Sequence, residues 1–384
     1  MSHILLMHGG APTAVINASL YGAVREAQES GFDGRILAAR GGTGGFLRES
    51  FIDLSSRPDS EIEALKYSPG SAIGSGRDHL ESEDYDRMIE LCRKHDISRV
   101  LLTGGNGTMD TCRKLSVAAK GSGVTVTGIP KTMDNDLSVT DHSPGFGSAA
   151  RYLAGSVREV AYDVKGLPIH VVVIETFGRD AGWLTASGVF ASTGRGSAPD
   201  MVLLPEVAFD EEKFLKRAEE LFRAKGGVVV LASEGLKGRD GNPIVEPIFS
   251  VGRSIYFGDV SAHLANLIIR KLGIKARSEK PGILGRCSEK WVSLSDREEA
   301  VACGRVSMRA ALNGLNGYMS IIKREDCPEY RVSFDAVPIR DEILKERTVP
   351  LEWIDSDAFS MKQEFINYAA PLVGGGLGEF VSFT

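Results

Sequence analysis

The stretch Val124-Thr-Val-Thr-Gly-Ile-Pro-Lys-Thr-Met-Asp-Asn-Asp-Leu137 joins a strand pattern to a loop with two carboxylates. Its amino-terminal part predicts a β-strand, because it is rich in β-branched residues. Asp134 and Asp136 follow in the loop, beside the hydroxyl of Thr132 and the ammonium of Lys131. Open α/β sheets bind ligands at the carboxyl ends of their strands. One carboxylate can take a proton from a hydroxyl while the other holds a metal or orients a phosphate, so the loop predicts phosphoryl-transfer chemistry.

A glycine-rich turn precedes that loop by about 25 residues. Residues 99–103 predict a buried strand, Gly104-Gly-Asn-Gly-Thr108 predicts a turn, and residues 109–120 predict a helix. Glycines at a strand-to-helix turn let backbone N–H groups approach a phosphate, and the amino end of a helix favours negative charge. Together with the two-carboxylate loop, this turn predicts a site for a phosphoryl donor.

Strand and helix patterns alternate along the whole chain. This alternation predicts parallel sheets with right-handed crossovers. With 384 residues, the chain is longer than one ordinary domain and is expected to form two lobes. Strands are expected at residues 4–7, 35–38, 100–103, 124–127, 170–175, 201–204 and 227–232, and helices at residues 18–30, 84–94, 149–163 and 210–224.

Composition excludes several classes of protein. A net charge of −6 argues against a nucleic-acid partner, because binding nucleic acid needs a basic surface. The five cysteines show neither metal-ligand spacing nor a disulfide framework, which is typical of a reducing compartment. The first residues predict a strand rather than a signal peptide, and no apolar run is long enough to span a bilayer. We therefore expect a cytoplasmic protein whose partners are small molecules.

Taken together, the motifs resemble those of the phosphofructokinase family, whose members use ATP or pyrophosphate. The resemblance runs in family order through roughly the first 290 residues. The segments that carry it are Gly9-Gly-Ala-Pro12 with Asn17, Gly74-Ser-Gly-Arg77, residues 104–108 and 130–136, Glu175-Thr-Phe-Gly-Arg179, Pro205-Glu206 and Ser233-Glu-Gly235. Residues 140–150 and 179–183 look most like the branch that uses pyrophosphate.

The resemblance implies an α/β fold of two Rossmann-like, three-layer α/β/α lobes with mostly parallel sheets. It places a donor-binding lobe at about residues 1–146 plus 288–340. An acceptor-binding lobe is expected at about residues 147–287 plus the carboxyl-terminal segment. The family further implies Mg²⁺ as cofactor and a homodimer or homotetramer. The implied reaction moves a phosphoryl group to the 1-hydroxyl of fructose 6-phosphate.

Each motif residue can be given an expected role. Asp134 is the candidate base that accepts the proton of the sugar hydroxyl. Asp136 is expected to help place Mg²⁺, and Thr132 to hydrogen-bond the acceptor or the transferred phosphoryl. Arg77 and Arg179 are expected to neutralise phosphoryl oxygens in the transition state. The implied donor contacts are Gly10, Arg77, Gly105, Asn106, Gly107, Thr108 and Lys131, and the implied acceptor contacts are Thr132, Asp134, Phe177, Gly178, Arg179, Glu234, Lys280 and Arg286.

Two positions bear on the donor, and they point in opposite directions. In the family, pyrophosphate users have an acidic residue where Gly107 stands, and its side chain occupies the room of an ATP α-phosphate. ATP users have glycine there. Where Lys131 stands, ATP users have glycine and pyrophosphate users have lysine, whose ammonium can pair with a small, highly charged donor. Because steric exclusion outweighs the tuning of affinity by one cation, we expect ATP as donor, with pyrophosphate as the alternative.

The metal and acceptor residues depart from the family pattern. Asn106 stands where many members have an aspartate, and because a neutral amide binds Mg²⁺ less well, Asp136 would carry more of the coordination. Arg286 replaces an aromatic residue and Glu289 replaces an arginine in the motif that contacts the sugar's 6-phosphate. The family has two further arginines at the positions of Lys280 and His170. Lys280, Arg286 and His170 could still bind a phosphate. Fructose 6-phosphate is the default acceptor, and another sugar, sugar phosphate or polyol is the alternative.

A non-catalytic nucleotide- or sugar-binding regulator on the same scaffold is the competing class of protein. The presence of Thr132, Asp134, Asp136 and Arg179 favours an enzyme, because a regulator has no need of the base.

Overall fold

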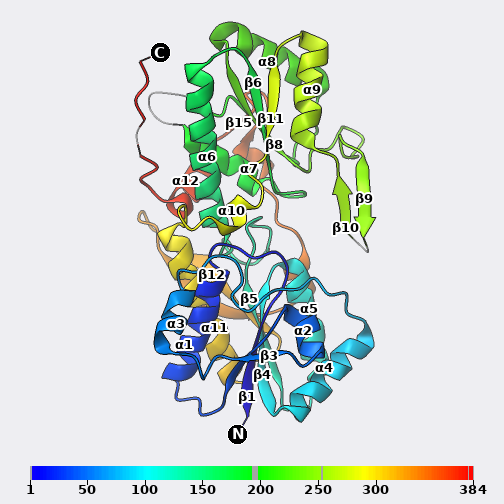
Figure 1. Ribbon diagram of the computed structural model, residues 1–384, viewed down its shortest axis with the longest axis vertical. Coiled ribbons are helices and arrows are strands. Elements are labelled where there is room, and N and C mark those ends of the chain that lie inside the picture. Colours follow the sequence, from blue (N-terminus) through cyan, green and yellow to red (C-terminus); the bar gives the residue numbers. More distant parts are fainter. Residues whose placement is uncertain (1, 193–197, 252–253, 379, 384) are drawn as a thin grey trace. The chain divides into compact units, whose positions relative to one another are not determined.

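A computed structural model describes residues 2–192, 198–251, 254–378 and 380–383 (Figure 1). The chain divides into two compact units. The first comprises Met1–Ala149 and Arg286–Arg347, and the second comprises Ala150–Gly285 and Thr348–Thr384. Each unit therefore contains two separate stretches of sequence, and no single cut in the chain would isolate either of them.

The first unit is built on a seven-stranded sheet in the order β13-β12-β5-β4-β1-β2-β3. Its central neighbours pair in parallel, whereas the two edge strands β3 and β13 pair antiparallel. Strands β1 and β4 have near-continuous apolar runs, because central parallel strands are covered on both faces. The bounds are β1 (His3–His8), β2 (Ile36–Ala39), β3 (Phe51–Asp53), β4 (Ile97–Gly104), β5 (Thr125–Pro130), β12 (Tyr318–Arg324) and β13 (Val332–Pro338).

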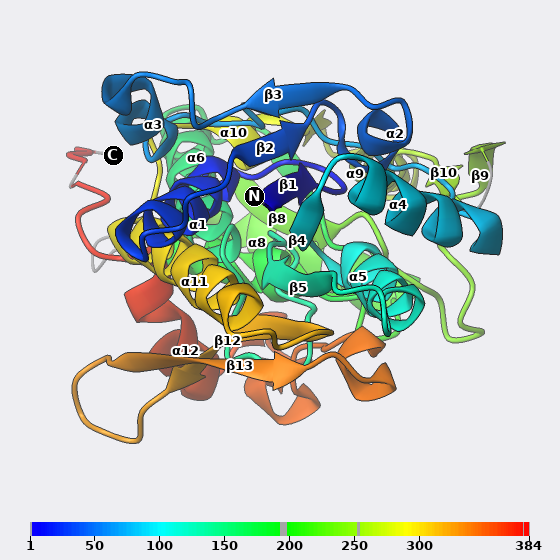
Figure 2. The same ribbon diagram turned by 90° about the horizontal axis from the view of Figure 1, so that it is seen from below.

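Helices cover both faces of this sheet, which gives the unit three layers (Figure 2). On one face, α1 (Ile16–Glu29), α3 (Asp59–Leu65) and α11 (Leu294–Leu312) pack around side chains such as Leu20 and Met308. On the other face lie α2 (Gly42–Leu47), α4 (Ser82–Lys94) and α5 (Asn106–Ala118). The short helix η2 (Asp341–Leu344) belongs to the same unit.

The second unit is built on a four-stranded parallel sheet in the order β11-β6-β8-β7. Helices α8 and α9 share a core with one face of this sheet, and α6 and α7 lie on the opposite side (Figure 1). The bounds are β6 (Val171–Thr176), β7 (Met201–Leu203), β8 (Val228–Ser233), β11 (Ala276–Glu279), α6 (Phe146–Gly166), α7 (Trp183–Ser187), α8 (Glu211–Lys225) and α9 (Val260–Leu272).

Short elements complete the fold. Two antiparallel pairs are formed by β9 (Pro247–Val251) with β10 (Ser254–Phe257) and by β14 (Ile354–Asp355) with β15 (Ser360–Met361). The remaining helices are α10 (Leu284–Cys287), α12 (Gln363–Val373), η1 (Gly188–Ala191) and η3 (Leu351–Trp353). Within the described ranges, no helix has both the length and the apolarity that crossing a bilayer requires.

The predicted fold class, α/β with two mostly parallel sheets, is confirmed. The helix expected at residues 109–120 begins earlier, at Asn106. Gly105 serves as its N-cap in an extended conformation, so the amino end of α5 lies directly at the glycine turn. This places the positive end of the helix dipole where the sequence predicts the phosphoryl donor.

Helices α1 and α11 cross at two glycines. A Cβ atom added to Gly22 would lie 2.0 Å from the carbonyl oxygen of Val301, and one added to Gly304 would lie 2.0 Å from that of Ser19. Real Cβ atoms do not approach backbone oxygens so closely, so any side chain here would push the helices apart. The position of α11 over the sheet therefore depends on these two glycines.

We expect Gly304→Ala to lower the free energy of unfolding by about 1–3 kcal/mol, because the added methyl overpacks a backbone contact. Chemical denaturation of the purified protein measures this. Gly166→Ala at the end of α6 is the matched control, since the added Cβ meets no described atom within 4 Å. It should change stability by no more than about 0.5 kcal/mol. Equal effects from both substitutions would contradict the helix-crossing argument.

Candidate active site

Backbone hydrogen bonds join the loops that follow β1, β4 and β5 in the first unit. The N–H of Gly9 donates to the carbonyl of Thr103 at 2.9 Å, and that of Lys131 donates to Gly104 at 3.0 Å. The N–H of Gly10 donates to Gly76 at 2.9 Å, which brings the loop containing Arg77 to the same edge. The structure therefore gathers the predicted donor segments of this unit at the carboxyl edge of one sheet.

Thr108 explains why two of the glycines cannot carry side chains. Cβ atoms added to Gly9 and Gly104 would lie 2.4 and 2.2 Å from its Oγ1. Thr108 is thus packed between the ends of two strands. Gly107 is different, because it is exposed and no described atom lies within 4 Å of its added Cβ. A side chain at position 107 would extend into open space.

Lys131 is a buried cation in the middle of these loops. Its side chain is 4% exposed, and its Nζ donates to the carbonyl of Ala11 at 2.6 Å. Burial lowers its pKa to about 8; Arg77 and Arg286 contribute to the lowering, while the two aspartates of the same loop oppose it. A cation is therefore held at this edge near neutral pH, with two further positive side chains near enough to act on it.

The two-carboxylate loop is held by its own polar side chains. The N–H of Asp134 donates to Oγ1 of Thr132 at 3.0 Å. The amide Nδ2 of Asn106 donates to Oδ2 of Asp136 at 2.9 Å. Burial raises the pKa of Asp136, and hydrogen bonds from Thr132 and Asn106 oppose this by favouring the carboxylate. The loop thus presents Asp134 and Asp136 next to the amino end of α5.

The residues predicted to hold Mg²⁺ fit a hard cation. The Oδ1 atoms of Asp136 and Asn106 are both buried, and neither has a hydrogen-bond partner among the described residues. Oxygen atoms in this state suit Mg²⁺, which usually takes one or two carboxylates together with waters and substrate phosphates. In the described part of the chain, no cluster of three or more acidic, histidine or cysteine side chains forms a closed metal cage.

Arg347 lies outside the two-carboxylate loop in sequence but forms hydrogen bonds with it. Sequence motifs do not identify this residue. Its N–H donates to the carbonyl of Asp136 at 2.8 Å. Its guanidinium donates to the carbonyls of Asn135 at 3.1 Å and Asp141 at 2.5 Å. Arg347 is 212 residues away from Asn135 along the chain, so no local motif could reveal this contact.

In the second unit, the loops after β6 and β8 bring Arg179 and Glu234 together. The N–H of Glu234 donates to the carbonyl of Thr176 at 3.0 Å, and Oγ of Ser233 donates to that of Gly178 at 2.5 Å. Burial raises the pKa of Glu234, and the positive charge of Arg179 opposes it. The predicted acceptor residues from Phe177 to Arg179 therefore lie beside the predicted Glu234.

Comparisons with known proteins identify the family of this chain. Residues 3–310 match the family model described as Phosphofructokinase. The chain belongs to the phosphofructokinase family. It is 37% identical to pyrophosphate--fructose 6-phosphate 1-phosphotransferase of Xanthomonas campestris pv. campestris, over 97% of this chain and 92% of that protein. The counterpart with the same name from Methylococcus capsulatus is 36% identical, over 97% and 94%.

Solved structures of the family give the same result. The crystal structure of pyrophosphate-dependent phosphofructokinase from Nitrosospira multiformis superimposes with a TM-score of 0.89 at 35% identity, covering 97% of this chain and 92% of that one. The corresponding structure from Marinobacter aquaeolei gives 0.88 at 34% identity, covering 100% and 94%. This member of the phosphofructokinase family is thus a phosphotransferase with an alcohol acceptor.

The three cations predicted to bind the acceptor phosphate have different surroundings. Lys280 makes ion pairs of 2.9 Å with both Glu175 and Asp259, which raise its pKa against the effect of burial. Arg286 belongs to the first unit, where its charge acts on Lys131. His170 is buried at the start of β6, and its pKa is lowered by burial and by neighbouring positive charges. A phosphate at Lys280 must therefore compete with two carboxylates.

If Asp134 is the base, Asp134→Asn should lower kcat by about 100-fold or more, because an amide cannot take the proton of the acceptor. Steady-state kinetics with the preferred donor and acceptor measure this. Asp110→Asn on α5 is the control, since its carboxylate only pairs with Arg113 and Lys114 on the surface. A near-normal kcat for Asp134→Asn would remove Asp134 from the role of base.

The pKa of about 8 at Lys131 predicts a pH dependence of donor binding. As pH rises through this value, the ammonium loses its charge, so kcat/KM for the donor should fall on the alkaline side. Lys131→Met should remove this part of the profile and lower kcat/KM by about 10- to 100-fold at pH 7, the effect of a lost charge-assisted hydrogen bond. An unchanged alkaline profile in the variant would exclude Lys131 as its source.

Proposed function

We propose that this chain transfers a phosphoryl group from pyrophosphate to the 1-hydroxyl of fructose 6-phosphate, with Mg²⁺. The observation that carries the choice of donor is Lys131, a buried ammonium among the donor loops that is near enough to Arg77 and Arg286 for their charges to lower its pKa. A cluster of cations suits a small donor with several negative charges. The names of the relatives at 35–37% identity support the same donor and acceptor.

This proposal revises the expectation from the sequence, which favoured ATP because of the open space at Gly107. Open space permits a nucleotide but supplies no group that binds one. The comparisons favour pyrophosphate, so the charge at Lys131 now outweighs the space at Gly107. ATP remains the second candidate because the space at Gly107 is real. An ATP-dependent 6-phosphofructokinase 2 of Streptomyces coelicolor is also 28% identical over 91% of this chain and 97% of that protein.

The proposed chemistry assigns a role to each of the predicted catalytic residues. Asp134 accepts the proton of the 1-hydroxyl as that oxygen attacks the terminal phosphorus, and the bond from this phosphorus to the bridging oxygen breaks. Lys131, Arg77 and Arg179 neutralise the charge on the phosphoryl oxygens and the departing phosphate. Asp136 and Asn106 would hold Mg²⁺, which supplies further neutralisation of the donor when it is bound.

The acceptor is bound, in this proposal, by Phe177, Gly178, Arg179 and Glu234. Glu234 accepts hydrogen bonds from sugar hydroxyls, and Lys280 and Arg286 contact the 6-phosphate. Because Lys280 already has two carboxylate partners, another sugar or a polyol is the alternative acceptor. From the family we also propose a homodimer or homotetramer.

A donor-by-acceptor activity grid tests the proposal directly. ATP and pyrophosphate are each paired with fructose 6-phosphate, fructose and other sugar phosphates, in the presence of Mg²⁺. Pyrophosphate with fructose 6-phosphate should give the highest kcat/KM. Transfer from ATP alone would reverse the choice of donor, and no transfer from either donor would favour a non-catalytic regulator.

Gly107→Asp sharpens the choice between donors. The added carboxylate enters open space, so the fold should be unaffected while the room for an ATP α-phosphate is lost. We expect any residual ATP activity to fall by about 10-fold or more, since a clash with the nucleotide or a repulsion of about 1.4 kcal/mol already costs that factor. Pyrophosphate activity should stay within about threefold of the wild-type value. Equal losses with both donors would contradict the steric argument.

A further inference from the structure

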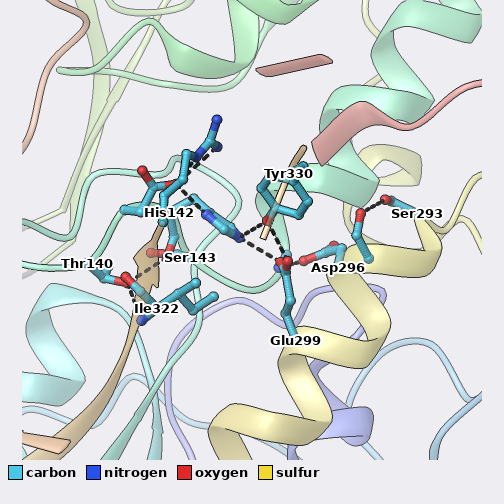
Figure 3. Close-up of polar contacts among 12 residues, drawn as sticks. Thr140, His142, Ser143, Ser293, Asp296, Glu299, Ile322 and Tyr330 are labelled. Atoms are coloured by element: carbon cyan, nitrogen blue, oxygen red, sulfur yellow. Dashed lines mark hydrogen bonds and ion pairs between the residues drawn. The ribbon is translucent and has the colours of Figure 1, made fainter. Parts of the chain in front are cut away.

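Figure 3 shows a buried polar network in the first unit, centred on residues that follow the two-carboxylate loop in the chain. Its centre is His142, which is 1% exposed. The ring Nδ1 lies 2.8 Å from Oδ2 of Asp141, and Nε2 lies 2.6 Å from Oε2 of Glu299 on α11. Each ring nitrogen therefore faces a carboxylate oxygen at hydrogen-bond distance.

Each of the two carboxylates accepts a further hydrogen bond. Oε1 of Glu299 accepts a hydrogen bond of 2.5 Å from the hydroxyl of Tyr330. Oδ2 of Asp141 also accepts from Nε of Arg324 at 3.2 Å. A carboxylate that is ionised can only accept, so a proton on each ring nitrogen of His142 satisfies both contacts. In that state the ring is an imidazolium, and His142 and Arg324 offset the charges of Asp141 and Glu299.

The backbone next to His142 connects this network to the two-carboxylate loop that contains Asp134 and Asp136. The N–H of Ser143 donates to Oδ1 of Asn135 at 3.0 Å. The carbonyl of Pro144 accepts from the N–H of Thr132 at 3.2 Å. The two residues that follow His142 thus contact the loop on both sides of Asp134. No other role in the proposed chemistry requires a charged histidine here.

A second carboxylate of α11, that of Asp296, binds the part of the chain that follows Ser143 and Pro144. Asp296 accepts from the N–H of Gly145 at 2.8 Å and from that of Ser148 at 2.9 Å, at the amino end of α6. Figure 3 shows Asp296 and Glu299 projecting from the same helix. Helix α11 therefore contacts the segment that supports the catalytic loop at two points, and only one of them depends on the protonation of His142.

We propose that His142, held as an imidazolium between Asp141 and Glu299, is a positioning residue that holds the loop of Asp134 and Asp136 in place for phosphoryl transfer. The effect on catalysis rests on the proposed function, whereas the effect on the loop does not. His142 does not touch the reacting atoms. It acts through Ser143 and Pro144, which hydrogen-bond the loop.

The proposal implies a dependence on pH with a definite sign. Burial lowers the pKa of His142, but the hydrogen bonds and charges of Asp141 and Glu299 raise it above its ordinary value of about 6.5. The stabilisation of the fold by protonated His142 is therefore complete below about pH 6.5. It is lost as pH rises through the higher pKa that His142 has in the folded state. Arg324, Arg347, Tyr330 and Asp296 are the other charged or titratable groups in this network.

Glu299→Gln tests the proposal, because the amide keeps the shape of the side chain but removes the anion that faces Nε2. We expect kcat to fall by about 10-fold, and its alkaline limb to move to lower pH by about 1 unit, the lower end of the effect of one nearby opposite charge. KM for the donor should change by less than about threefold. The pH effect of Lys131 can be distinguished from that of His142, because ionisation of Lys131 affects kcat/KM for the donor rather than kcat.

Glu49→Gln is the matched control. Oε2 of Glu49 faces Nε2 of His95 at 2.6 Å, the same distance as in the His142–Glu299 pair, but at the end of α4 and partly exposed. This variant should leave kcat and its pH profile unchanged. Backbone amide exchange at Thr132 and Ser143 should accelerate in Glu299→Gln and remain as in the wild type in Glu49→Gln.

The outcomes separate the two proposals. Absence of transfer by the wild type in the activity grid would refute the proposed function, and amide exchange would still report on the loop. Equal exchange in wild type and Glu299→Gln would overturn the positioning role. The positioning role would also be overturned if Glu299→Gln only lowered the melting temperature while its kcat kept the wild-type pH profile. If Glu299→Gln does not fold, the neutral pair His142→Gln/Glu299→Gln replaces it, and its kcat should lack the alkaline limb attributed to His142.

Discussion

The conformation of the two-carboxylate loop depends on the buried side chain of Asn135. Its backbone adopts a φ of +55°, a left-handed conformation that asparagine tolerates better than most residues. Its side chain is fully buried and accepts a hydrogen bond from Ser143, while its carbonyl accepts from Arg347. Because Asn135 is held in the interior, the flanking Asp134 and Asp136 remain partly exposed. A loop with two neighbouring carboxylates thus keeps one shape.

Electrostatic balance gives the same edge of the sheet its chemical character. Lys131 opposes the charges of the two aspartates, and the arginines near it make the surroundings attractive to a polyanion. The Oδ1 atoms of Asn106 and Asp136, which have no hydrogen-bond partner among the described residues, are suited to a metal. Most of the charges are thus in place before a ligand binds, which reduces the reorganisation required when negative charge develops on the phosphoryl group.

Local sequence motifs predict those parts of the site whose functional residues are adjacent in the chain. The glycine turn and the aspartate loop could be recognised because each follows directly from a strand. Arg347 and Glu299 could not, because their contacts join residues far apart in the chain. The ion pairs of Lys280 with Glu175 and Asp259 were also invisible, so its positive charge looked more available than it is. The open space at Gly107 favours ATP as donor, whereas the names of the relatives favour pyrophosphate.

Gly107 stands apart from the other glycines of the donor loops. Gly9 and Gly104 are packed against Thr108, so a side chain at either position would have to disrupt the ends of β1 and β4. Gly107 has no described neighbour within 4 Å of an added Cβ. A substitution at Gly107 therefore avoids the steric penalty that is expected at Gly9 and Gly104. Position 107 can therefore vary in evolution without a compensating change in the packing of the strand ends, because its side chain would extend into open space.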